Sequence, residues 1–161
     1  MMLQYIWTNS KGVTVKYRFV EIKWDMCVLL SEKIEHRLNS FETVSSFNDA
    51  DGGILTFKSV HPKHSFAKVD GDGYVTEVAE KNPISNDATV GIYHFKKGID
   101  WVKYAEQMIE KNIRTNNEFY VCPVYNEAIK SGLKIKASLV DEMWGMGTPE
   151  ELNNFLTHYK A

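Results

Sequence analysis

The sequence has few cysteines and no long apolar run, and both absences limit where the protein works. Cys27 and Cys122 are its only cysteines, and they lie far apart in apolar surroundings, so we expect buried, reduced thiols rather than a disulfide. No apolar run approaches the roughly 20 residues that a membrane-spanning helix needs. Residues 1–10 also lack the basic segment and apolar core of a signal peptide. The sequence therefore predicts a cytoplasmic protein without a membrane partner.

A large charge of one sign is also absent. The chain of 161 residues carries a formal net charge of -2, and no basic patch is interleaved with aromatic side chains. This balance gives no electrostatic reason to expect binding to nucleic acid. The hydrophobic fraction of 43% and the length are ordinary for one soluble domain with a sizeable core, so we expect a single domain over residues 1–161.

Common catalytic and phosphate-binding motifs are missing. Neither glycine-rich phosphate-loop pattern occurs, and no local spacing suggests a serine or cysteine nucleophile with its histidine. His61 and His64 lie close in sequence, but zinc would need two further ligands that the sequence does not supply. Residues 70–73 resemble the start of a calcium loop, yet Lys81 stands where that loop has its twelfth-position glutamate. We therefore expect a hairpin turn at 70–73.

The patterns along the chain predict an α/β protein with a mixed sheet. Residues 1–9 carry no clear pattern, and Pro123 interrupts the first turns of one expected helix. The last helix begins with Thr148 as its cap and is expected to bury a stripe of Leu152, Phe155, Leu156 and Tyr159. The expected strands are 13–19, 26–30, 54–57, 65–69, 74–80, 88–95 and 134–140, and the expected helices are 38–47, 100–110, 118–129 and 149–159.

One strand end carries a pair of charges suited to binding. Glu80 and Lys81 end the strand 74–80, and Pro83 prevents its ladder from continuing. A carboxylate there can accept hydrogen bonds from a diol, and an ammonium can neutralise a phosphate. The alternative is a solvated ion pair at a strand exit. Gly91, in the middle of the strand 88–95, indicates either a bulge or a ligand that approaches the backbone closely.

Four motifs in order carry a resemblance to a known family. They are DGGILTF at 51–57, VTEVAEKNPISNDATVGIYHF at 75–95, NEFYVCPVYNEAI at 117–129 and MWGMGTPEEL at 143–152. Residues 51–156 resemble the later half of bacterial sugar-1-phosphate nucleotidyltransferases, which are similar to glucose-1-phosphate thymidylyltransferases, whereas residues 1–50 match poorly. The resemblance implies a Rossmann-like doubly wound α/β fold, here in partial form. It also implies Mg²⁺ and two substrates, a nucleoside triphosphate and a sugar 1-phosphate, which react to give a nucleotide sugar and pyrophosphate.

The resemblance assigns a sugar-phosphate site as well. It implies that Glu80 binds sugar hydroxyls and Lys81 the sugar phosphate, and that Gly91 lets a pyranose lie against bare backbone. A loop containing Asn117 and Glu118 is expected to close on the sugar. The implied site residues are Glu80, Lys81, Thr89, Gly91, Tyr93, Asn117 and Glu118.

Three departures from the family pattern concern the nucleotide and the metal. The amino-terminal strand and its glycine-rich triphosphate loop are absent. The first metal aspartate falls near Ser31, where the adjacent Glu32 is expected to point to the other face, and the second metal carboxylate falls on Gly145. Asp141 and Glu142 are alternatives that no pattern supports. The metal ligands are therefore unidentified.

These departures predict a truncated sugar-binding half with little or no transferase activity on its own. One alternative is a non-catalytic sugar-phosphate-binding or assembly module. A homodimer, or a chain supplying the missing half, would then cover the incomplete sheet. A further alternative is an unrelated α/β protein in which Glu80 and Lys81 are surface residues.

Overall fold

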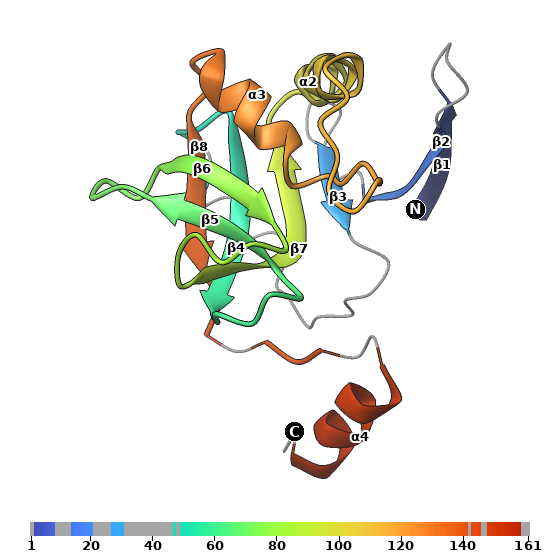
Figure 1. The fold of residues 1–161 in the computed structure, drawn as a ribbon, viewed down its shortest axis with the longest axis vertical. Coiled ribbons are helices and arrows are strands. Elements are labelled where there is room, and N and C mark those ends of the chain that lie inside the picture. Colours follow the sequence, from blue (N-terminus) through green and yellow to red (C-terminus); the bar gives the residue numbers. More distant parts are fainter. Residues whose placement is uncertain are drawn as a thin grey trace.

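A single sheet of eight strands is the centre of the described structure (Figure 1). The computed structural model describes the backbone of residues 2–8, 14–20 and 27–30, and the whole of residues 47, 49–141, 143–145 and 148–158. The strand order is β1-β2-β3-β7-β4-β8, and β5 pairs with β6 and β7 beside this path. The strands are β1 (Met2–Thr8), β2 (Thr14–Val20), β3 (Cys27–Leu30), β4 (Gly52–Lys58), β5 (Ser65–Val69), β6 (Val75–Glu80), β7 (Asp87–Phe95) and β8 (Ile135–Leu139); the helices are α2 (Gly98–Glu110), α3 (Val124–Lys130) and α4 (Pro149–His158).

The sheet is mixed, as the sequence predicts. Strands β1, β2, β3, β7 and β4 pair antiparallel in turn, and β8 then adds to β4 in parallel. The parallel pair requires the chain to cross over between β4 and β8, and α2 and α3 lie in that crossover. The fold class is therefore α/β with a mixed sheet.

The larger core lies between the sheet and the two helices α2 and α3. Ile54 on β4 is fully buried against this layer, and its neighbour Leu55 belongs to a second cluster with Phe47 and Val90. Adjacent residues of a strand point to opposite faces, so β4 contributes to both clusters. Helix α2 faces this core with Trp101, Tyr104, Ala105, Met108 and Ile109, which are buried, and Val102 packs against it while only partly buried.

Several element boundaries differ from the sequence prediction. No element is predicted over Met2–Thr8, but this segment forms strand β1 and pairs with β2. The predicted helix 118–129 is wrong in its first half, because α3 begins only at Val124, directly after Pro123. Proline has a helical φ but no N–H to donate, so it suits the start of this helix and not its interior. The predicted helix 38–47 lies outside the described residues except at its last position.

The predicted buried stripe of α4 is also wrong. Glu151 N–H donates to Thr148 Oγ1 at 3.2 Å, so the predicted cap is present. None of the helix's described residues is buried, however: Leu152 is 43% exposed and Leu156 68% exposed, and Tyr159 lies outside the described residues. Figure 1 shows α4 set apart from the sheet. Periodicity identifies an amphipathic helix but does not supply the surface that would cover it.

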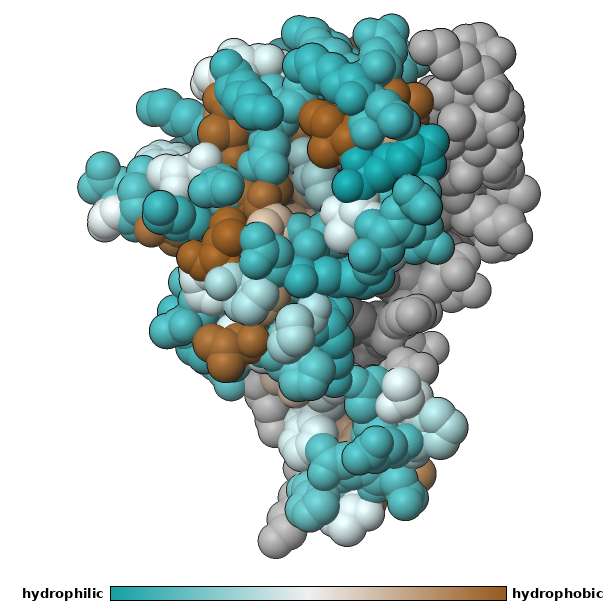
Figure 2. Space-filling view, viewed as in Figure 1, coloured by the Kyte–Doolittle hydropathy of each residue, from teal (hydrophilic) through white to brown (hydrophobic). Residues whose placement is uncertain are grey.

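Among the residues described with side chains, large exposed apolar residues occur in several segments, and two of them lie one turn apart on α4. The face in Figure 2 is mostly hydrophilic with separate apolar patches. The large exposed apolar residues come from different parts of the chain: Val60, Ile99, Leu139, Leu152 and Leu156. Homodimerisation therefore stays a prediction.

A buried carboxylate connects α2 to α3. Glu127 on α3 is 1% exposed, and its carboxylate accepts hydrogen bonds from Lys111, just after α2, and from Lys130 at 3.0 Å. The hydrogen bond from Lys111 is the main cause that lowers the pKa of Glu127. Both lysines are mostly exposed, so solvent screens the attraction.

We expect Glu127→Gln to lower the free energy of unfolding by about 1 kcal/mol at pH 7, because the neutral amide keeps the shape but loses the charge-assisted bonds. The folded pKa is depressed, so this contribution is present above the ordinary value of 4.5 and is lost as the pH falls through the folded pKa. Urea unfolding at pH 7 and pH 3 measures it. Glu110→Gln, at an exposed position of α2, is the matched control. Equal stability of wild type and Glu127→Gln at pH 7 would contradict the prediction.

Candidate functional site

The end of β6 holds the first part of the site. The hairpin between β5 and β6 turns at residues 70–73, where Gly73 has a φ of 86° and its N–H donates to the Asp70 carbonyl at 3.2 Å. This confirms the predicted turn. The resulting register places Ser65 opposite Glu80, and Ser65 Oγ donates to Glu80 Oε2 at 2.5 Å. Burial raises the pKa of Glu80, and the hydrogen bond from Ser65 partly opposes that shift.

Lys81 is fixed through both its backbone and its side chain. Its φ of 54° is left-handed, and its N–H donates to the His64 carbonyl at 3.0 Å. Its ammonium donates to the Tyr120 hydroxyl and lies 4.4 Å from the centroid of that ring. The bond to Tyr120 is the main cause that raises the pKa of Lys81. Glu80 and Lys81 therefore each have a side-chain partner of their own, Ser65 and Tyr120.

Tyr120 joins Lys81 to the predicted sugar loop. The hydroxyl that accepts from Lys81 donates to Glu118 Oε2 at 2.5 Å. One phenol thus holds an ammonium and a carboxylate from two distant parts of the chain in one place. Sequence reasoning missed Tyr120 as a site residue, although it lies within one of the four motifs.

The loop before Tyr120 is a tight turn. Thr115 and Glu118 exchange two backbone hydrogen bonds, of 3.0 and 2.9 Å, and the φ angles of Asn116 and Asn117 are 49° and 62°. Two successive residues with positive φ define a type I′ turn, and asparagine is among the residues that tolerate it. Arg114 Nη1 donates to the Asn117 carbonyl at 2.8 Å. The turn orients Glu118 toward Tyr120, and both Asn117 and Glu118 are exposed.

Gly91 lies in a bulge of β7. Ile54 and Thr56 of β4 pair with Tyr93 and Thr89, so β7 has more residues than β4 over this stretch. Gly91 has a φ of 81°, which favours glycine. The bulge brings Thr89 and Tyr93 to neighbouring positions, and their hydroxyls lie 2.8 Å apart. The bulge reading of Gly91 is confirmed, and its contact with a pyranose stays a prediction.

Buried hydroxyl and thiol groups lie beneath Glu80. Tyr93 and Cys122 are both buried, and burial raises the pKa of the phenol and of the thiol. The negative charge of Glu80 raises both pKa values further. The two groups are therefore neutral donors at physiological pH, next to a carboxylate. Ser65 was not predicted, and only its cross-strand position opposite Glu80 could have revealed it.

The described residues do not identify the ligands of the Mg²⁺ that the resemblance implies. No group of three or more His, Cys, Asp or Glu side chains gathers in the part of the chain that the structure describes with side chains. Asp141 is exposed, and Glu32 and Glu142 lie outside the described residues. Because Mg²⁺ is usually held by one or two carboxylates together with substrate phosphates, its binding to this chain stays a prediction without identified ligands. Within the described ranges, no helix is long and apolar enough to cross a membrane.

The comparisons with known proteins agree with this architecture. No protein-family model and no curated protein matches the chain. Among solved structures, a nucleoside-diphosphate-sugar pyrophosphorylase from Vibrio cholerae RC9 is 28% identical, with a TM-score of 0.65 over 81% of this chain and 53% of that one. The chain is thus similar to that protein in fold and, at low identity, in sequence.

Two further solved structures share the fold at lower identity. A CMP:2-keto-3-deoxy-manno-octonic acid synthetase complexed with CTP has 16% identity and a TM-score of 0.56, covering 83% of this chain and 61% of that one. A putative glucose-1-phosphate thymidylyltransferase from Bacillus anthracis, in complex with a sucrose, has 18% identity and a TM-score of 0.57, covering 81% and 52%. The chain therefore has a nucleotidyltransferase-like fold and spans roughly half to three fifths of the length of these proteins.

Proposed function

We propose that the chain binds a sugar 1-phosphate as the sugar-binding part of a nucleotidyltransferase that makes nucleotide sugars. The observation that carries the proposal is the Lys81–Tyr120–Glu118 chain of hydrogen bonds beside Glu80. It places one ammonium and two carboxylates around the end of a rigid strand. A phosphorylated sugar presents the complementary groups, an anion and several hydroxyls.

Each group has a distinct task in this proposal. The Lys81 ammonium neutralises the phosphate, and Glu80 and Glu118 accept hydrogen bonds from sugar hydroxyls. The neutral Tyr93 hydroxyl donates or accepts at the floor of the site. In the complete reaction a phosphate oxygen of the sugar bonds to the α-phosphorus of the nucleotide, and the bond to the leaving pyrophosphate breaks. The sugar-binding residues contribute by holding that oxygen in line.

Titration with a hexose 1-phosphate tests the proposal. We expect amide shifts at Glu80, Lys81 and Tyr93 in NMR spectra, and tighter binding than either inorganic phosphate or the free hexose shows. Inorganic phosphate can make only the contacts of the phosphate group, and the free hexose can make only the contacts of the sugar hydroxyls. Unchanged amide positions at these three residues at millimolar hexose 1-phosphate would refute the proposal.

Binding without transfer is the second candidate, favoured because the described residues hold no cluster of metal ligands. In that case the chain is a sugar-phosphate-binding or assembly module. We expect pyrophosphate release from nucleoside triphosphate, hexose 1-phosphate and Mg²⁺ to be no faster than with Lys81→Ala. Release well above that variant would establish transferase activity in this chain alone. Sedimentation in the same buffer tests whether the active species is a homodimer.

A further inference from the structure

One side chain outside the predicted site connects its two halves. Strand β6 pairs with β5 along its length, and helix α3 lies against its other edge. There the Val78 N–H donates to Asn126 Oδ1 at 2.9 Å, and Asn126 Nδ2 donates to the Val78 carbonyl at 2.8 Å. The side-chain amide thus makes the two hydrogen bonds that a neighbouring strand would make.

Both ends of this connection lead to the site. Val78 precedes Glu80 by one intervening residue on β6. Asn126 lies in the first turn of α3, which directly follows the segment carrying Glu118 and Tyr120. The site is therefore built from two chain segments, and the paired hydrogen bonds of Asn126 join the elements that carry them.

Helix α3 is itself anchored to the centre of the sheet. Tyr125 Oη donates to the His94 carbonyl of β7 at 3.0 Å and lies 3.2 Å from the Gly53 carbonyl of β4. Because α3 is fixed to β4 and β7 through Tyr125, Asn126 positions β6 relative to the sheet and not merely relative to a loop.

We propose that Asn126 is a positioning residue for the sugar-phosphate site, a role that rests on the proposed function. It fixes the distance between the β6 groups, Glu80 and Lys81, and the carboxylate of Glu118. A ligand that contacts both segments depends on that distance. A ligand that contacts Lys81 alone does not.

The experiment compares two ligands on matched variants. Asn126→Ala removes both hydrogen bonds. Glu127→Gln on the same helix is the stability control, since its contacts are to lysines and not to β6. Asn153→Ala, at an exposed position of α4, controls for the loss of an asparagine. Affinities for hexose 1-phosphate and for inorganic phosphate are measured by calorimetry at a temperature where urea unfolding shows every variant to be folded.

We expect Asn126→Ala to bind hexose 1-phosphate about tenfold more weakly and inorganic phosphate within about twofold of wild type, while both controls stay within twofold for each ligand. Equal hexose 1-phosphate affinity in wild type and Asn126→Ala would overturn the positioning role. So would an equal loss in Asn126→Ala and Glu127→Gln, because that loss would follow from stability alone.

Failure of the proposed function gives a different result. A wild-type chain that binds neither ligand overturns both proposals. Amide hydrogen exchange still tests the structural pairing without any ligand: we expect Val78 to exchange at least about tenfold faster in Asn126→Ala, and an unchanged rate would overturn the pairing itself.

Discussion

Replacing Lys81 with alanine is expected to weaken the binding of a hexose 1-phosphate by about 10- to 100-fold. A hydrogen bond to a charged group contributes about 1.5–3 kcal/mol, and the ammonium of Lys81 follows Glu80 in the chain and is joined to Glu118 through the Tyr120 hydroxyl. Without it, a phosphate dianion would face two carboxylates and no cation from this strand end. Calorimetric titration of wild type and variant measures the change.

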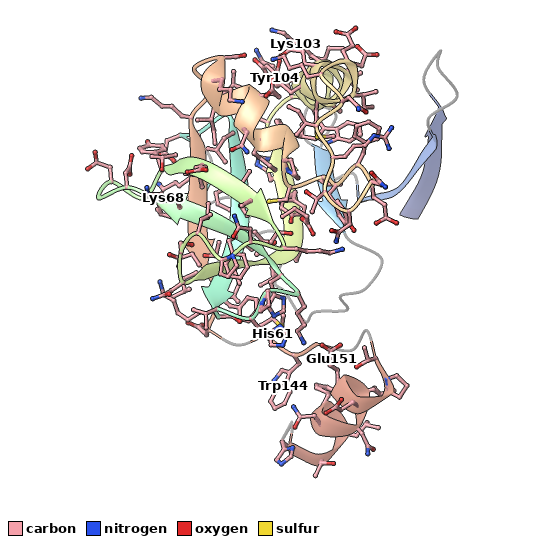
Figure 3. All side chains as sticks on the ribbon, in the orientation of Figure 1. His61, Lys68, Lys103, Tyr104, Trp144 and Glu151 are labelled. Carbon is pink, nitrogen blue, oxygen red and sulfur yellow. The ribbon has the colours of Figure 1, made fainter. Side chains whose placement is uncertain are left out.

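The ligand and the control variant make the Lys81 result specific. Affinity for the free hexose is expected to change less than threefold, because the hexose lacks the phosphate. Lys68→Ala, which removes an exposed lysine from β5 in the same hairpin, is expected to leave both affinities unchanged (Figure 3). An equal loss in the two lysine variants would indicate a general effect of charge and would contradict a site at Lys81.

The second large effect concerns acid stability and arises at His94. Its ring stacks on Phe47 with centroids 5.7 Å apart, and it is 4% exposed. Neither ring nitrogen has a hydrogen-bond partner among the described residues. Burial, with a smaller contribution from Lys96, lowers the pKa of His94 from 6.5 to about 4. The folded protein therefore holds a neutral imidazole that the unfolded chain protonates readily.

We expect His94 to remove about 3 kcal/mol from the free energy of unfolding as the pH falls from 6.5 to 4. The folded pKa lies below the unfolded one. The full free energy of unfolding is therefore present above pH 6.5 and declines as the pH falls through that window. Urea unfolding at intervals between pH 8 and pH 4 measures the slope. In His94→Leu we expect most of the slope to disappear, with stability at pH 8 within about 1 kcal/mol of wild type.

A second histidine, His64, is expected to add to this decline of stability with falling pH. Burial also lowers the pKa of His64, so His64→Gln is expected to remove a further part of the decline in the same direction. If the slope of His94→Leu matched that of wild type, the imidazole would not be the titrating group.

The local elements of the fold could be predicted because their residues carry the signal. Alternation identified strands β2, β6 and β8, and the glycines at 70–73 identified the turn. Strand β1 has no such alternation and is defined by its pairing with β2. Helix α4 shows the same limit. Its apolar periodicity correctly predicts an amphipathic helix, but the prediction that these apolar side chains are buried is wrong. Figure 3 shows Glu151 directed toward the loop around His61, and its carboxylate pairs with Lys63 at 2.5 Å.

The candidate site divides in the same way. Glu80 and Lys81 are adjacent, so their chemistry was visible in the sequence. Ser65 and Tyr120 reach them only through the hairpin register and the fold of a distant segment. The role of Asn126 could not be predicted at all, because nothing in the sequence indicates that an asparagine in a helix hydrogen-bonds to a strand. Residues that support a site through the backbone of another element leave no local pattern.

The position of β8 has a consequence for synthesis of the chain. Strand β4 is complete only when β8 joins its far edge, and β8 is made after all the other strands. A nascent chain on the ribosome therefore exposes an unpaired edge of β4, whose first five residues are buried in the folded protein, until the last crossover emerges. A stop codon placed before Ile135 is expected to yield insoluble protein, even though every candidate binding residue has by then been translated.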